Sequence, residues 1–124
     1  MKKAEKSSEI LVVDDSEDMR ELIMEMVRDA GYFVIGAESA EMAIETMRFL
    51  KFDAVVSDVE LPGKNGLELA QIIAKESPQT KIILISGSMI PAIADKAYAM
   101  GIECIVKPFA MSILLQKLER LIGK

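Results

Sequence analysis

At residues 53–66 the chain reads DAVVSDVELPGKNG. The apolar run in this stretch ends at the carboxylate of Asp58, and turn-forming residues follow it closely. A short run of β-branched residues bounded by turn formers predicts a strand that is buried on both faces. Asp58 is then expected at the carboxyl end of that strand, where open α/β sheets bind their ligands. We therefore interpret Asp58 as the functional centre and as a nucleophile that accepts a phosphoryl group.

Further apolar runs and amphipathic segments flank this strand. Strands are predicted at residues 10–13, 32–37, 81–85 and 103–106, and helices at residues 19–30, 40–50, 67–76, 91–100 and 111–122. Ser16 and Ser39 are expected to be helix N-caps. The helical stripes place Leu22 and Leu50 in the core and leave Met24 exposed. Five strands alternating with five helices predict an α/β fold with a doubly wound, five-stranded parallel sheet.

The composition indicates one globular domain. The chain has 124 residues, of which 51% are hydrophobic, enough for one buried core. We expect residues 1–8 to be a flexible leader and residues 9–124 to form the domain. No stretch approaches membrane-spanning length. The net charge of −5 argues against direct binding of nucleic acid, whose phosphates are bound mainly by Lys and Arg.

Two scarce residue types exclude further chemistries. The sequence contains no histidine, so histidine-based acid–base and nucleophilic catalysis are excluded. Its one cysteine, Cys104, cannot form an intramolecular disulfide, which favours the cytoplasm. A zinc site built from cysteine and histidine is excluded for the same reasons.

Polar and charged residues follow four of the predicted strands. Parallel strands end at the same edge of a sheet, so Asp14, Asp15, Asp58, Ser86 and Lys107 are expected to converge in one cleft. Clustered carboxylates repel one another unless a cation joins them, and oxygen ligands of this kind suit Mg²⁺. The Lys107 ammonium and the Ser86 hydroxyl would hold phosphoryl oxygens, because phosphoryl transfer needs mainly positioning and charge neutralisation. Singly, each residue also fits a helix cap, a turn or a solvated surface position.

This set of residues closely resembles the receiver domain of bacterial two-component response regulators, and the resemblance covers about residues 9–122. It implies the CheY-like, flavodoxin-like sheet order 2-1-3-4-5. It further implies a signalling phosphoacceptor rather than an enzyme, although one that assists its own phosphorylation and dephosphorylation. Its phosphodonor would be a histidine kinase, and its target a downstream protein partner or output domain; the domain itself would act in the cytoplasm.

The resemblance also implies roles for the site residues. Asp58 would be the phosphoacceptor. Asp15, Asp58 and the backbone carbonyl of Glu60 would ligate Mg²⁺, with Asp14 acting through a metal-bound water. Ser86 and Lys107 match the hydroxyl and the lysine of the family, and the lysine precedes a proline in a cis peptide bond.

The chain departs from the family pattern at Cys104. Three residues before the lysine the family usually carries Tyr or Phe, whose rotamer couples phosphorylation to the output surface. A thiol cannot replace that ring, so we expect the signal to travel through residues 87–89 and the start of the fourth helix. We also expect Glu60 and Ser88 to alter the lifetime of the phosphoryl group, because they lie two residues beyond Asp58 and Ser86.

Three other interpretations compete with this one. A phosphatase of the haloacid dehalogenase class would also use a strand-end aspartate and Mg²⁺, but it starts from Asp-x-Asp and needs room for a cap domain. A flavin-binding module would need a phosphate-binding loop after the first strand, where this chain has an acidic cluster. A receiver that binds a partner without being phosphorylated would not require Asp15, Asp58 and Lys107 together.

Overall fold

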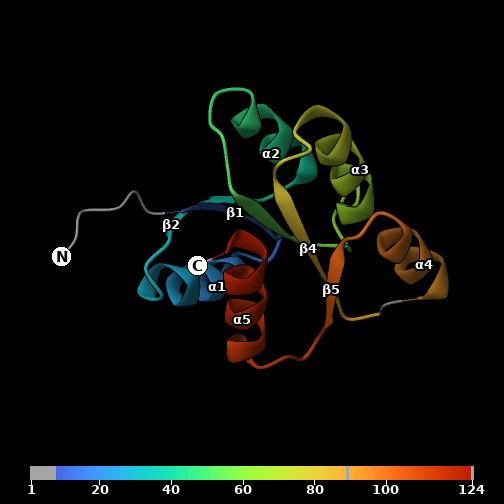
Figure 1. Cartoon of the computed structure of the whole chain (residues 1–124). Helices are drawn as coiled ribbons and strands as arrows, with labels where there is room; N and C mark the ends of the chain where they lie inside the picture. Colours follow the sequence, from blue (N-terminus) through green and yellow to red (C-terminus); the bar gives the residue numbers. More distant parts are fainter. Residues whose placement is uncertain (1–7, 89, 124) are drawn as a thin grey trace.

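The computed structural model describes residues 8–88 and 90–123, in which five strands alternate with five helices. The strands are β1 (Glu9–Val13), β2 (Phe33–Ala37), β3 (Ala54–Asp58), β4 (Lys81–Ser86) and β5 (Glu103–Val106). The helices are α1 (Glu17–Asp29), α2 (Ala40–Met47), α3 (Gly66–Glu76), α4 (Pro91–Ala99) and α5 (Met111–Ile122). All strands pair in parallel in the order β2-β1-β3-β4-β5 (Figure 1). The predicted fold class and strand order are therefore confirmed.

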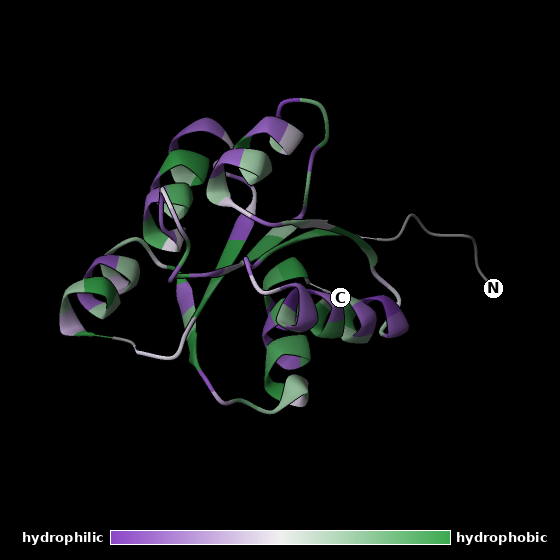
Figure 2. Cartoon of the chain, turned by 180° about the vertical axis from the view of Figure 1, so that it is seen from behind, coloured by the Kyte–Doolittle hydropathy of each residue, from purple (hydrophilic) through white to green (hydrophobic). Residues whose placement is uncertain are grey.

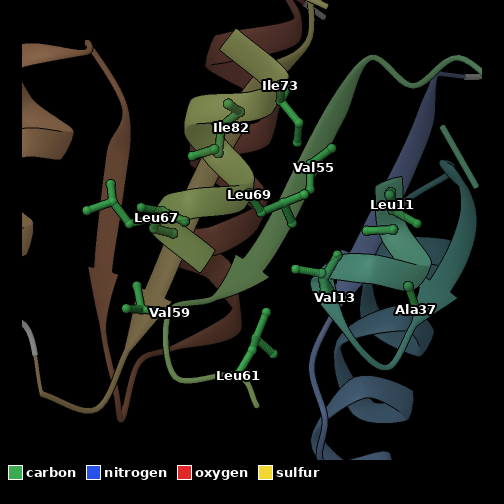
Figure 3. Packing of buried hydrophobic residues seen from close by; sticks show 14 of the residues in the cluster. Leu11, Val13, Ala37, Val55, Val59, Leu61, Leu67, Leu69, Ile73 and Ile82 are labelled. Carbon is green, nitrogen blue, oxygen red and sulfur yellow. The ribbon is translucent and has the colours of Figure 1, made fainter. Parts of the chain in front are cut away.

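Helices cover both faces of the sheet. α1 and α5 lie on one face, and α2, α3 and α4 lie on the other (Figure 1). Side chains alternate along a strand, so Leu11 and Val13 pack toward α2–α4 while Ile10 and Val12 pack toward α1 and α5. Figure 3 shows the first of these two clusters, and Figure 2 shows that the apolar residues follow the strands and the inward sides of the helices. β3 is buried along its whole length, as predicted.

Short polar side chains fix the starts of three helices. Ser16 and Ser39 accept backbone N–H groups at the starts of α1 and α2, which confirms both predicted caps. Asn65 begins α3 with a reciprocal pair of hydrogen bonds. Its side chain accepts the Glu68 N–H at 2.8 Å, and the Glu68 carboxylate accepts the Asn65 N–H at 2.8 Å. This capping box starts α3 directly after the loop that follows Asp58.

Three side chains lie differently from the sequence prediction. Leu50 follows the end of α2 and is 44% exposed, and Leu22 of α1 is 47% exposed. Met24 was expected on the surface but packs against the cluster between the sheet and α1. The reason is Gly36 of β2, where an added Cβ would lie 2.6 Å from the Met24 sulfur. Met24 occupies the space that this glycine leaves, and helical periodicity alone does not reveal it.

Within the described part of the chain, no helix combines the length and the apolar character that crossing a bilayer requires.

Candidate functional site

Three carboxylates meet at the carboxyl edge of the sheet. Asp14 and Asp15 follow β1, and Asp58 ends β3. One carboxylate oxygen from each of the three lies within 4.8 Å of the others. Asp14 and Asp58 are buried and Asp15 is exposed, so the cluster opens to solvent on one side. An all-oxygen donor set of this charge fits a hard divalent cation such as Mg²⁺.

Asp58 is held at both oxygens. Its Oδ2 accepts a hydrogen bond from Lys107 Nζ at 3.0 Å, and its Oδ1 accepts the backbone N–H of Glu60 at 3.1 Å. Burial raises the pKa of Asp58, and the nearby charge of Asp14 adds to the effect, while Lys107 and the Glu60 N–H partly oppose it. The carboxylate is therefore fixed in position but poorly solvated, so a nearby positive charge stabilises its ionised form.

Lys107 supplies such a charge. Burial alone would lower its pKa, but the hydrogen bond to Asp58 and the charges of Asp58, Asp14 and Glu60 outweigh burial, so the pKa of Lys107 is raised. The lysine thus stays cationic at neutral pH. Its backbone N–H donates to the Ser86 carbonyl at 2.8 Å, which ties it to the end of β4. The peptide bond from Lys107 to Pro108 is cis, as the family resemblance implied.

Asp14 is oriented by α1. Its Oδ1 accepts the backbone N–H of Ser16 at 2.9 Å, and its carbonyl oxygen accepts a hydrogen bond from the Arg20 guanidinium at 2.8 Å. The sequence prediction did not include Arg20. The position one helical turn after Ser16 is the only signal for it, and that spacing does not show that the side chain turns back toward β1.

The loop after Asp58 is compact and tied to α2. Gly66 lies against the backbone carbonyl of Asp58, which an added Cβ would strike, so only glycine fits there without displacement. The Glu41 carboxylate accepts the Lys64 N–H at 3.1 Å and lies beside Gly63. That N–H lowers the pKa of Glu41. The sequence prediction did not include this contact either, because Glu41 lies 23 residues from Lys64 along the chain.

Ser86 lies at the same edge, but its hydroxyl points to another partner. The side chain is fully buried, and its Oγ donates to Glu60 Oε2 at 2.5 Å. The same oxygen accepts the backbone N–H of Ser88 at 3.0 Å. The structure therefore brings together all five predicted side chains at one edge, and it adds the Glu60 carboxylate as an unpredicted neighbour of the Ser86 hydroxyl.

The sequence also matches a known protein family. A sequence model of the response regulator receiver domain matches residues 10–119, which is most of the chain. The chain is a response regulator receiver domain. Receiver domains of this kind belong to two-component systems, in which they act as signalling phosphoacceptors. Nothing in the comparisons favours the haloacid dehalogenase or flavin-binding interpretations.

Relatives of this receiver domain extend over nearly its whole length. It is 34% identical over 113 residues to the chemotaxis protein CheY of Thermotoga maritima, covering 90% of this chain and 94% of the relative. It is 36% identical over 118 residues to the chemotaxis protein CheY of Listeria monocytogenes, covering 90% and 95% of the two chains. Among solved structures, response regulator TrrA of Thermotoga maritima in complex with Mg(2+)-BeF superposes with a TM-score of 0.82 at 34% identity, covering 92% and 98% of the chains.

Proposed function

We propose that Asp58 accepts a phosphoryl group from the phosphohistidine of a histidine kinase. In this step an Asp58 carboxylate oxygen bonds to phosphorus, and the bond from phosphorus to the histidine nitrogen breaks, with its electron pair going to the imidazole. The observation that carries the proposal is the contact of 3.0 Å between Lys107 Nζ and Asp58 Oδ2 inside a cluster of three carboxylates. Such a site offers a nucleophile and a cation at one point.

The acidic cluster suits Mg²⁺ as the cofactor. Asp15, Asp58 and the backbone carbonyl of Glu60 would hold the ion, with Asp14 completing the shell from its buried position. When bound, Mg²⁺ neutralises charge on the phosphoryl oxygens, which is the main need of phosphoryl transfer. Two side chains would hold the other phosphoryl oxygens: the Lys107 ammonium would pair with one, and the Ser86 hydroxyl would donate a hydrogen bond to another.

The domain would act in a two-component pathway. In the cytoplasm, a histidine kinase would donate the phosphoryl group to this domain, and a downstream protein or an output domain would bind according to its change of conformation. The domain would assist its own phosphorylation and dephosphorylation without turning over a separate substrate. Residues 9–124 would form this unit, preceded by a leader at residues 1–8, and residues 1–7 of that leader lie outside the described residues.

Acetyl phosphate with Mg²⁺ tests the assignment without a kinase. Wild-type protein is expected to gain the mass of one phosphoryl group, and Asp58→Asn is expected to gain none. Asp53→Asn is the matched control. Asp53 directly precedes the amino end of β3, away from the site, and its carboxylate accepts the Glu9 N–H at 2.7 Å. Incorporation that survives in Asp58→Asn would refute the assignment, and no incorporation in wild type would favour a receiver that binds without phosphorylation.

A further inference from the structure

The Ser86 hydroxyl is engaged by Glu60 before any phosphoryl group arrives. Ser86 Oγ donates to Glu60 Oε2 at 2.5 Å, although Ser86 is fully buried and Glu60 is an exposed residue of the loop after β3. A hydroxyl carries one proton and donates one hydrogen bond at a time. While Glu60 accepts that proton, Ser86 has none to donate to a phosphoryl oxygen on Asp58.

We propose that Glu60 is a positioning residue that competes with the phosphoryl group for the Ser86 hydroxyl and thereby lowers the population of the activated conformation. This inference rests on the proposed phosphorylation of Asp58. Hydrogen bonds from a hydroxyl to an anion are strong whichever anion accepts them. When the Ser86 hydroxyl turns from Glu60 to a phosphoryl oxygen, it therefore exchanges one strong hydrogen bond for another. Little net stabilisation of the activated state remains.

The geometry also shows what the exchange would disturb. The Ser86 Oγ that faces Glu60 also accepts the Ser88 N–H at 3.0 Å. A change of Ser86 rotamer moves the acceptor of that N–H, so the backbone at Ser88 loses a hydrogen bond when Glu60 loses its donor. Glu60, Ser86 and Ser88 thus form a chain of hydrogen bonds that links the loop after Asp58 to the segment before α4.

A binding titration measures the competition. Beryllofluoride serves as the phosphoryl mimic at saturating Mg²⁺, with backbone amide shifts as the readout. Glu60→Ala is expected to bind it about tenfold more tightly than wild type, and Glu60→Gln, which keeps a neutral acceptor, should lie between the two. Both variants keep the Glu60 backbone carbonyl. Glu38→Gln is the matched control, because it removes the same charge just after β2 and Glu38 makes no hydrogen bond or ion pair within residues 8–88 and 90–123.

A double-mutant cycle separates competition from simple repulsion. If Glu60 acts through the hydroxyl, Glu60→Ala should change beryllofluoride affinity less than about twofold in a Ser86→Ala background. A tenfold gain that persists without the hydroxyl would show that Glu60 acts by its charge alone, and this result would overturn the proposal. Equal affinities of wild type and Glu60→Ala would overturn it too.

A second measurement needs no phosphoryl mimic. Three-bond couplings should report one χ1 rotamer for Ser86 in the free wild-type protein and averaging among rotamers in Glu60→Ala. An unchanged single rotamer would overturn the proposal. If wild type fails to bind beryllofluoride with Mg²⁺, the proposed function fails instead, and the rotamer measurement alone decides whether Glu60 holds the hydroxyl.

Discussion

Asp15 is the exposed member of the three clustered carboxylates, so it can be changed without opening the core. Replacing its carboxylate by an amide keeps the shape but removes one charge that a hard divalent cation needs. We expect Asp15→Asn to weaken Mg²⁺ binding at least roughly tenfold, as measured by calorimetry or by amide shifts near Asp14, Asp58 and Glu60. Asp18→Asn, an exposed change in the first turn of α1, should bind Mg²⁺ as wild type does. Equal affinities of the two variants would remove Asp15 from the metal site.

The residues that sequence reasoning found and those it missed differ in one physical respect. Asp14, Asp58 and Lys107 follow strands, and the ends of parallel strands meet whatever the details of the loops. The contact of Glu60 with Ser86 depends instead on the direction of a loop side chain, which no periodicity encodes. Its sequence signal was only its place two residues after Asp58, enough to suggest an effect on the phosphoryl group but not its sign.

At the scale of elements, an ion-pair cluster joins β5 to α5. The Glu103 carboxylate lies 2.9 Å from Lys117 Nζ and 3.2 Å from an Arg120 nitrogen. The hydrogen bond from Lys117 and the charges of both cations lower the pKa of Glu103, and burial opposes them only in part. A pKa that is lower in the folded state stabilises the fold above the ordinary pKa of 4.5, and the stabilisation is lost as the pH falls through the folded value.

Glu103→Gln should therefore lower the free energy of unfolding by about 0.5–1 kcal/mol at pH 7, a small value because the cluster is partly exposed. The difference from wild type should shrink as the pH falls below 4.5. Urea denaturation at neutral and acid pH measures it, with Glu25→Gln on the exposed side of α1 as the control. A destabilisation that is equally large at acid pH would mean that Glu103 acts by packing and not by charge.

Element boundaries were predictable where a local signal marks them. Ser16 and Ser39 each precede a helix that they cap, and both were identified from the sequence. α2 was predicted to end at residue 50, but it ends at Met47. The prediction was too long because the apolar pattern continues past the last helical turn into Phe49 and Leu50, which are exposed. Apolar periodicity cannot distinguish a buried stripe from apolar residues left on the surface.

At the scale of the whole molecule, the expected signal from Asp58 would have to reach a distant surface without the aromatic ring that the family usually carries at the position of Cys104. Cys104 is half-buried on β5 and lines a surface hollow of about 370 Å³ together with Ala94, Tyr98, Gly101 and Ile102. Burial, aided by the charge of Glu103, raises the pKa of the thiol, so Cys104 stays neutral and packs as a small apolar group. Its displacement would therefore remodel little surface.

We expect the signal to run instead from Ser86 along the backbone to α4. The Ser88 N–H depends on Ser86 Oγ, and α4 begins at Pro91 with no side-chain hydrogen bond at its N-cap, Ile90. An uncapped helix start responds to small changes in the segment before it. Met89 lies outside the described residues, so the expectation for residues 87–89 concerns Gly87 and Ser88 most directly.

Structures with and without beryllofluoride at Asp58 test this route. We expect Gly87, Ser88 and the first turn of α4 to move when the mimic binds, because the Ser86 hydroxyl must turn toward the new anion and release the Ser88 N–H. Tyr98, which lies near the end of α4 and borders the hollow beside Cys104, should keep its position relative to β5. If residues 87–91 stay fixed while the surface around Cys104 rearranges, the thiol transmits the signal and the route through Ser88 is wrong. Cys104→Ser distinguishes the two routes in solution. If the signal passes through Ser86 and Ser88, this variant should show the same beryllofluoride-induced amide shift at Ser88 as wild type.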